Sequence, residues 1–181
     1  MNYDEINQKY FIVEYDPHIN NSAEYPIIKS IEILSEAEYS PVIRKTYDNY
    51  VFLGIVAAGC FILGQIAQGF FQKLGATIYD QLCIYLKKFS ESRINKHELY
   101  FSFNVKNDDE LLEVYLSLIN PSQDDIEWLF KYGFSLLDEK TRNLKLSGKN
   151  IGKIVFSITQ KNLVFAYALT RDCDVLENIN S

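Results

Sequence analysis

The residues most able to do chemistry are few and lie far apart in the chain. His18 and His97 are the only histidines, and no HxxxH, HxxE or CxxC spacing accompanies either of them. Histidine metal sites depend on such spacings or on nearby carboxylates that complete the ligand set. We therefore interpret both histidines as surface loop residues and predict no metal site.

One short motif has the spacing of a catalytic site. Asp138, Glu139 and Lys140 form the D-x-K pattern of metal-dependent nucleases, in which carboxylates hold magnesium and the lysine stabilises negative charge. Those enzymes place the motif on a strand, whereas here it ends a predicted helix, where acidic and basic surface residues are common. The acidic clusters at 108–110 and 124–127 fit turn and helix-cap roles. We predict no catalytic residue and no cofactor.

Negative charge is concentrated in the first quarter of the chain. The net charge is −6, and residues 1–43 contain eight acidic residues against two lysines. An acidic surface repels nucleic acid and attracts a basic protein partner. We therefore predict no nucleic-acid binding, and we name Glu32, Glu36 and Glu38 as candidate partner-binding residues.

The most informative segment is 49–72, which has 24 residues and no charge. It is long enough to span a bilayer and equally able to form a buried helix. One helix over 49–89 would measure roughly 60 Å, against a radius of gyration of roughly 16 Å for a domain of this length, so it must break near 64–75 or enter a membrane. We predict a buried Gly/Ala-rich helix over 50–64. The alternative is a membrane span over 50–71.

The remaining elements follow from hydrophobic periodicity. We predict strands over 10–15, 27–34, 98–105, 110–119, 151–159 and 163–170, amphipathic helices over 71–89 and 123–140, and a loose tail over 172–181. The 110–119 segment could also form a helix, although its alternation favours the strand. Residues 1–181 are predicted to be one α+β domain with an acidic strand segment (1–43), a central helical segment (49–89) and a strand–helix–strand part (98–170). Its sheet is predicted to be mixed or mainly antiparallel, with about five or six strands around the 50–64 helix.

The function predicted from these patterns is non-catalytic binding of another protein, which is expected to be basic. The three cysteines are odd in number and show no pairing motif, which indicates a reducing compartment and a cytoplasmic location. The profile of a small acidic protein without catalytic motifs resembles that of bacterial immunity proteins, which plug cognate toxins, and this resemblance implies an immunity or defence-associated role. The alternatives are a single-span membrane-anchored protein and an enzyme with an unrecognised site.

Overall fold

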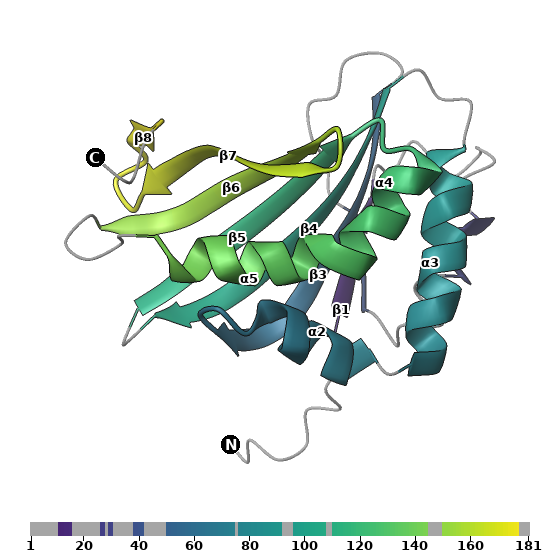
Figure 1. The fold of residues 1–181 in the computed structure, drawn as a ribbon, viewed down its shortest axis with the longest axis horizontal. Coiled ribbons are helices and arrows are strands. Elements are labelled where there is room, and N and C mark those ends of the chain that lie inside the picture. The colour runs from purple at the N-terminus through teal and green to yellow at the C-terminus, as the bar shows by residue number, and fades with distance from the viewer. Residues whose placement is uncertain are drawn as a thin grey trace.

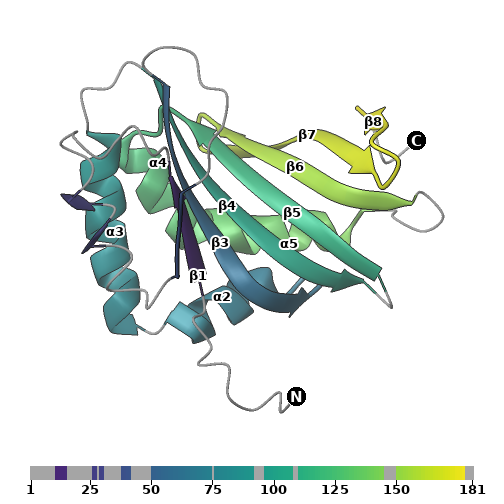
Figure 2. The ribbon, with the colours of Figure 1, turned by 180° about the vertical axis from the view of Figure 1, so that it is seen from behind.

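One mixed β-sheet organises the part of the chain that the structure describes. The computed structural model describes residues 11–15, 26–27, 29–30, 38–41, 50–74, 76–91, 96–107, 110–144 and 150–177. Helices pack on one face of the sheet, as Figure 1 shows from the helix side and Figure 2 from behind. The predicted α+β class is confirmed. None of the helices in these ranges combines the length and the apolar character that crossing a membrane requires.

The sheet of the described residues has eight strands, more than the five or six predicted. Its order is β2-β1-β3-β4-β5-β6-β7-β8. The strands are β1 (Phe11–Tyr15), β2 (Glu38–Pro41), β3 (Tyr50–Ile62), β4 (Lys96–Asn107), β5 (Glu110–Ile119), β6 (Ile151–Thr159), β7 (Asn162–Thr170) and β8 (Val175–Leu176). The helices are α2 (Ile66–Leu74), α3 (Ala76–Ser90), α4 (Gln123–Trp128), the π-helical turn η2 (Leu129–Gly133) and α5 (Phe134–Arg142).

Two helical crossovers and one hairpin build the centre of the sheet. The parallel pair β3 and β4 is joined through α2 and α3, and the parallel pair β5 and β6 through α4, η2 and α5. The antiparallel β4–β5 hairpin reverses the strand direction, so β5 and β6 run opposite to β3 and β4, while each new strand is still added on the same side of the sheet. The helices of both crossovers lie on the same face. Two such crossovers between oppositely directed strand pairs have opposite hands. One of them is therefore left-handed, against the strong preference for right-handed crossovers.

The predicted helix over 50–64 is wrong, because residues 50–62 form strand β3. This strand lies inside the sheet, between antiparallel β1 and parallel β4. A strand with apolar contacts on both faces is a nearly continuous apolar run, which periodicity does not distinguish from a buried helix. Phe52 contributes to a cluster on one face, while Leu53 and Ile55 enter the main core on the other.

The helical predictions are confirmed in outline and corrected in their boundaries. The predicted helix over 71–89 is divided between two helices, since α2 ends at Leu74 and α3 begins at Ala76. The predicted helix over 123–140 runs from 123 to 142 through the π-helical turn. Ser122 caps it in a reciprocal capping box with Asp125.

One predicted strand is wrong, the tail prediction is contradicted only at 175–176, and several strands are confirmed. A strand was predicted over 27–34, but the described residues at 26–27 and 29–30 are helical, and 31–34 lie outside the described residues. The tail predicted to be loose contains β8, which pairs with β7. The strands predicted over 10–15, 98–105, 110–119, 151–159 and 163–170 correspond to β1, β4, β5, β6 and β7.

Aromatic side chains join the helices to the sheet in the main core. Phe70 of α2 stacks on Phe134 of α5 with ring centroids 4.9 Å apart. Phe101 and Phe103 of β4 approach Phe134 edge-on at 5.3 and 5.8 Å. Offset and edge-on geometries are the favourable ones for aromatic pairs, and burial of such rings dominates the energy of a core. This cluster therefore fixes α2 and α5 on the same face of β4.

Candidate functional site

The face of the sheet opposite the helices, which we call the open face, is the most distinctive surface of the described residues. No described helix covers it (Figure 2). Its centre is closed by its own side chains, because Phe52, Tyr100, Tyr115 and Val155 form a second buried cluster. The rings of Tyr100 and Tyr115 stack with centroids 4.9 Å apart. The open face is therefore an aromatic layer and not a bare polar surface.

A glycine on β3 makes room for this aromatic layer. Gly54 pairs with Tyr100 across the β3–β4 ladder and with Glu14 across the β1–β3 ladder. A Cβ at Gly54 would overlap the ring of Tyr100. With hydrogen in that place, the Tyr100 ring lies over β3 and its hydroxyl donates a hydrogen bond to the Glu14 carboxylate. Gly54 is thus required for the close approach of the ring and not for backbone conformation.

Two glutamates hold the polar groups beside the aromatic layer. Glu98 accepts hydrogen bonds from the hydroxyls of Tyr115 and Ser117 at 3.2 and 2.6 Å. Glu113 accepts one from the Ser102 hydroxyl at 2.8 Å and forms an ion pair with Lys153 at 3.2 Å.

The Lys153 ammonium also lies 4.5 Å from the centroid of the Tyr115 ring, within the range of a cation–π contact. These contacts link β4, β5 and β6 across the open face. Each of the two carboxylates is engaged by hydroxyl or ammonium donors, which is a stabilising arrangement.

Large apolar side chains are exposed around this layer. Of the seven large apolar residues that are exposed in the described part of the chain, five lie on β5, β7 and β8. They are Leu111, Ile119, Val164, Tyr167 and Val175. The strand registers place them on the open face, in the alternation that includes Glu113, Tyr115 and Ser117. Solvated sheet faces normally carry polar residues at such positions, so this composition is typical of a face that meets another surface.

A hollow of about 390 Å³ lies at one end of the sheet, where the parallel strands β5 and β6 end and the chain enters α4. Its lining includes Ser117, Ile119, Ser157, Thr159 and Asp125. Ligands of α/β sheets often bind at the carboxyl ends of parallel strands. Asp125 is the one acidic or basic residue of this lining, and it accepts hydrogen bonds from Ser122 in the capping box.

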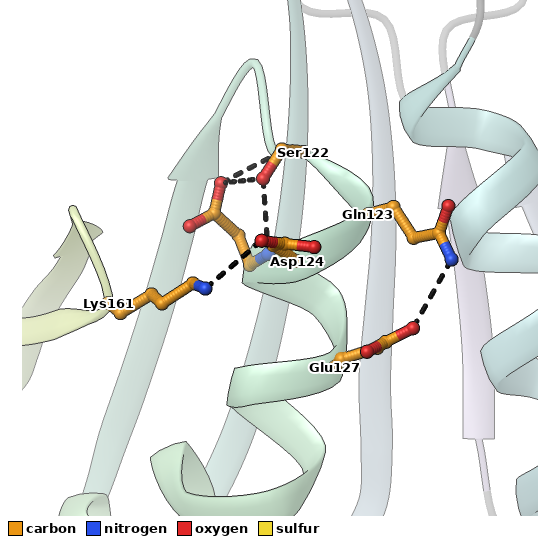
Figure 3. A network of polar contacts seen from close by, with 6 residues as sticks. Ser122, Gln123, Asp124, Glu127 and Lys161 are labelled. Carbon is orange, nitrogen blue, oxygen red and sulfur yellow. Dashed lines mark hydrogen bonds and ion pairs between the residues drawn. The ribbon is translucent and has the colours of Figure 1, made fainter.

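The start of α4 beside this hollow is held by polar contacts, which Figure 3 shows. Asp124 forms an ion pair with Lys161 of the β6–β7 turn at 3.1 Å. Glu127 accepts a hydrogen bond from the Gln123 amide at 3.2 Å and pairs with Lys87 of α3 at 2.7 Å. The predicted helix-cap role of the acidic cluster at 124–127 is therefore confirmed. The Lys87 partner lowers the pKa of the Glu127 carboxyl.

Asp138 was predicted to be a surface residue, and this is wrong. Its side chain is buried, and its carboxylate accepts the backbone N–H groups of Ile66 and Ala67 at 2.5 and 2.8 Å. Burial raises the pKa of the Asp138 carboxyl, while these two N–H donors and the charge of Arg142 oppose the rise. Arg142 also donates to the Gly64 carbonyl at 3.1 Å. Asp138 therefore joins α5 to the first turn of α2, a structural role that sequence spacing could not reveal.

The remaining residues named in the sequence analysis, three glutamates and two histidines, do not come together in one site of the described structure. The carboxylates of Glu32 and Glu36 lie outside the described residues, and Glu38 is described only as a backbone position of β2. His97 was predicted to be a loop residue, but it belongs to β4 and is only 5% exposed, because it shares the helix-facing alternation of Leu99. His18 lies outside the described residues. Within the described ranges, no group of three or more His, Cys, Asp or Glu residues could hold a metal ion.

Comparison with known proteins finds no relative. No protein-family model matches the chain, and no match was found among the curated proteins or the solved structures.

Proposed function

We propose that this chain is a non-catalytic protein-binding module and that its partner docks on the open face. The observation that carries the proposal is the position of the exposed apolar side chains of β5, β7 and β8 on the face that no described helix covers. Apolar surface of this kind is a feature of protein interaction sites. The exposed ring of Tyr167 adds the residue type that is enriched in such interfaces.

The aromatic layer supports this role by making the open face rigid. The Tyr100–Tyr115 stack and the ion pair between Lys153 and Glu113 fix the centre of the face. A rigid surface loses little conformational entropy when a partner binds, which favours affinity. The hollow at the end of β5 and β6 is large enough to receive one side chain of a partner.

The net charge of −6 favours a basic partner. Neutralisation of a toxin, the role implied by the resemblance to immunity proteins, is one instance of such binding. The acidic residues Glu32, Glu36 and Glu38 are proposed to accelerate the encounter. Replacing all three by lysine is expected to slow association with the captured partner and to flatten its dependence on salt. Association kinetics measured at several salt concentrations test this, and unchanged kinetics would remove the electrostatic part of the proposal.

The docking surface is tested by affinity capture from the native host with variants of matched chemistry. Leu111→Asp and Ile119→Asp place a charge on the open face at side chains that are 55% and 56% exposed. Ile84→Asp is the control, because Ile84 is 45% exposed on α3, on the helix side of the molecule. We expect the open-face variants to lose the partner that the wild type and the control retain. Equal capture of one partner by all four proteins would refute the assignment of the surface.

A further inference from the structure

Among the described residues, no strand lies beside the outer edge of β7 over most of its length. Strand β8 pairs with only two residues of β7, Ala168 and Leu169. Within the described residues, positions 162–167 therefore have β6 on one side and no strand on the other. Proteins usually protect such edges with charged residues or proline, and the β7 sequence NLVFAYALT contains neither.

The β6–β7 turn determines which backbone groups face this edge. Gln160 and Lys161 have φ values of 51° and 56°, so they form the two-residue type I′ turn of a tight hairpin. In such a hairpin the flanking residues, Thr159 and Asn162, are the first hydrogen-bonded pair. The following pairs alternate between hydrogen-bonded and non-hydrogen-bonded geometry.

This alternation directs two residues of β7 outward. Leu163 and Phe165 occupy non-hydrogen-bonded positions opposite β6, so their N–H and C=O groups point to the open edge. The regular edge ends there, because a register irregularity follows Phe165. A partner strand can therefore form four backbone hydrogen bonds, two with each of these residues. An edge with this pattern requires an extended strand as its occupant.

The edge is complementary to itself. When two copies of β7 run antiparallel, Leu163 of each copy lies opposite Phe165 of the other, and all four outward groups of each copy are paired. Val164 then lies on the two-fold axis, and its side chain is apolar and 42% exposed. Lys161, beside the edge, is in an ion pair with Asp124 at 3.1 Å, so no uncompensated charge of the turn opposes the approach.

From this geometry we infer that β7 binds the β7 strand of a second copy of the chain. The product is a two-fold symmetric dimer in which the two sheets form one continuous sheet. The interface is isologous, as in most soluble homodimers. The inferred dimer and the proposed docking on the open face share Val164 of β7, but their tests are distinguishable, because Leu111 and Ile119 of β5 are not part of the edge. The short contact predicts a weak dimer.

The first test is sedimentation equilibrium of the full chain from about 10 µM to about 1 mM, a range suited to a small interface. The average mass of the wild type should rise from 21.0 kDa toward twice that value. Val164→Lys places two positive charges together at the axis and should weaken association at least about tenfold. Ile84→Lys, at an exposed site on α3, should associate like the wild type. A wild type that stays monomeric, or a Val164→Lys variant that dimerises normally, would overturn the inference.

The second test examines the register. Val164 and its symmetry mate would form a non-hydrogen-bonded pair with Cα atoms roughly 4.5 Å apart, within the range of a disulfide. In a background with the exposed Cys173 replaced by serine, Val164→Cys should form a disulfide-linked dimer rapidly under mild oxidation. Ile119→Cys, at a more exposed site on β5, is the control. Cross-linking of Val164→Cys that is no faster than that of the control would refute this pairing.

Discussion

The contact of Asp138 with α2 gives the sharpest prediction about stability. Its carboxylate accepts two N–H groups of the first helical turn, which have no partner within the helix itself. A hydrogen bond to a charged group contributes roughly 1.5–3 kcal/mol, and the cost of burying the carboxylate offsets part of that gain. We therefore expect Asp138→Ala to lower the free energy of unfolding by about 2–4 kcal/mol. Asp138→Asn keeps one acceptor oxygen and should cost about half as much.

Urea unfolding at pH 7, followed by circular dichroism, measures these differences. Glu139→Ala is the matched control, because Glu139 is the exposed neighbour of Asp138 on the same helix, and it should change the free energy of unfolding by less than about 0.5 kcal/mol. If Asp138→Ala has as little effect as Glu139→Ala, the carboxylate does not stabilise the start of α2.

The pH dependence of unfolding tests whether burial or the helix N–H groups have the larger effect on the pKa of the Asp138 carboxyl. Burial raises the pKa of Asp138, so the folded protein keeps this proton to higher pH than the unfolded chain does. The contribution of Asp138 to the free energy of unfolding is therefore greatest below the usual carboxyl pKa of about 4 and decreases as pH rises through the folded pKa.

Because asparagine does not titrate, the stability of the wild type minus that of Asp138→Asn should fall over this interval and then become constant. A difference that grows with pH would show that the helix N–H groups outweigh burial.

Three further predictions concern single contacts. Gly54→Ala should displace the Tyr100 ring and lower the free energy of unfolding, measured by urea unfolding, by about 1–3 kcal/mol. Gly152→Ala is the control and should change it little, because the added methyl group would meet only the flexible Arg171 side chain. Ser122→Ala removes the capping box of α4 and should cost about 1 kcal/mol in the same assay. Burial raises the pKa of the Cys83 thiol, so at pH 8 a thiol reagent followed by mass spectrometry should modify it at least about tenfold more slowly than the exposed Cys173. Equal rates would contradict the burial of Cys83.

The sequence predicted most of the strands and failed at the apolar segment for a physical reason. Alternation identified β4, because Leu99, Phe101 and Phe103 face the helices while Tyr100 and Ser102 face the other side. Residues 50–62 do not alternate in this way, since both faces of β3 make apolar contacts. The signals that favoured a strand were the β-branched and aromatic residues and the recurring glycines, which weaken a helix.

The candidate site was less accessible to prediction, because its contacts join residues that are distant in the chain. The hydrogen bond between Ile66 and Asp138 spans 72 positions, so no local pattern could show that Asp138 stabilises the start of a helix. The open face depends on the pairing of Gly54 with Tyr100, which becomes apparent only when β3 and β4 are known to be parallel neighbours. Exposure of Ile119 and Val164 likewise depends on which face the helices cover.

The hands of the two crossovers explain why an open face exists. With strand direction reversed by the β4–β5 hairpin and the strand order continuing, two right-handed crossovers would place their helices on opposite faces. The helices would then cover both sides of the sheet. With one left-handed crossover, α2 and α5 meet on a single face and share the Phe70–Phe134 stack. The Tyr100–Tyr115 stack is therefore needed to close the centre of the other face. The same departure from the usual hand leaves the surface that we propose binds a partner.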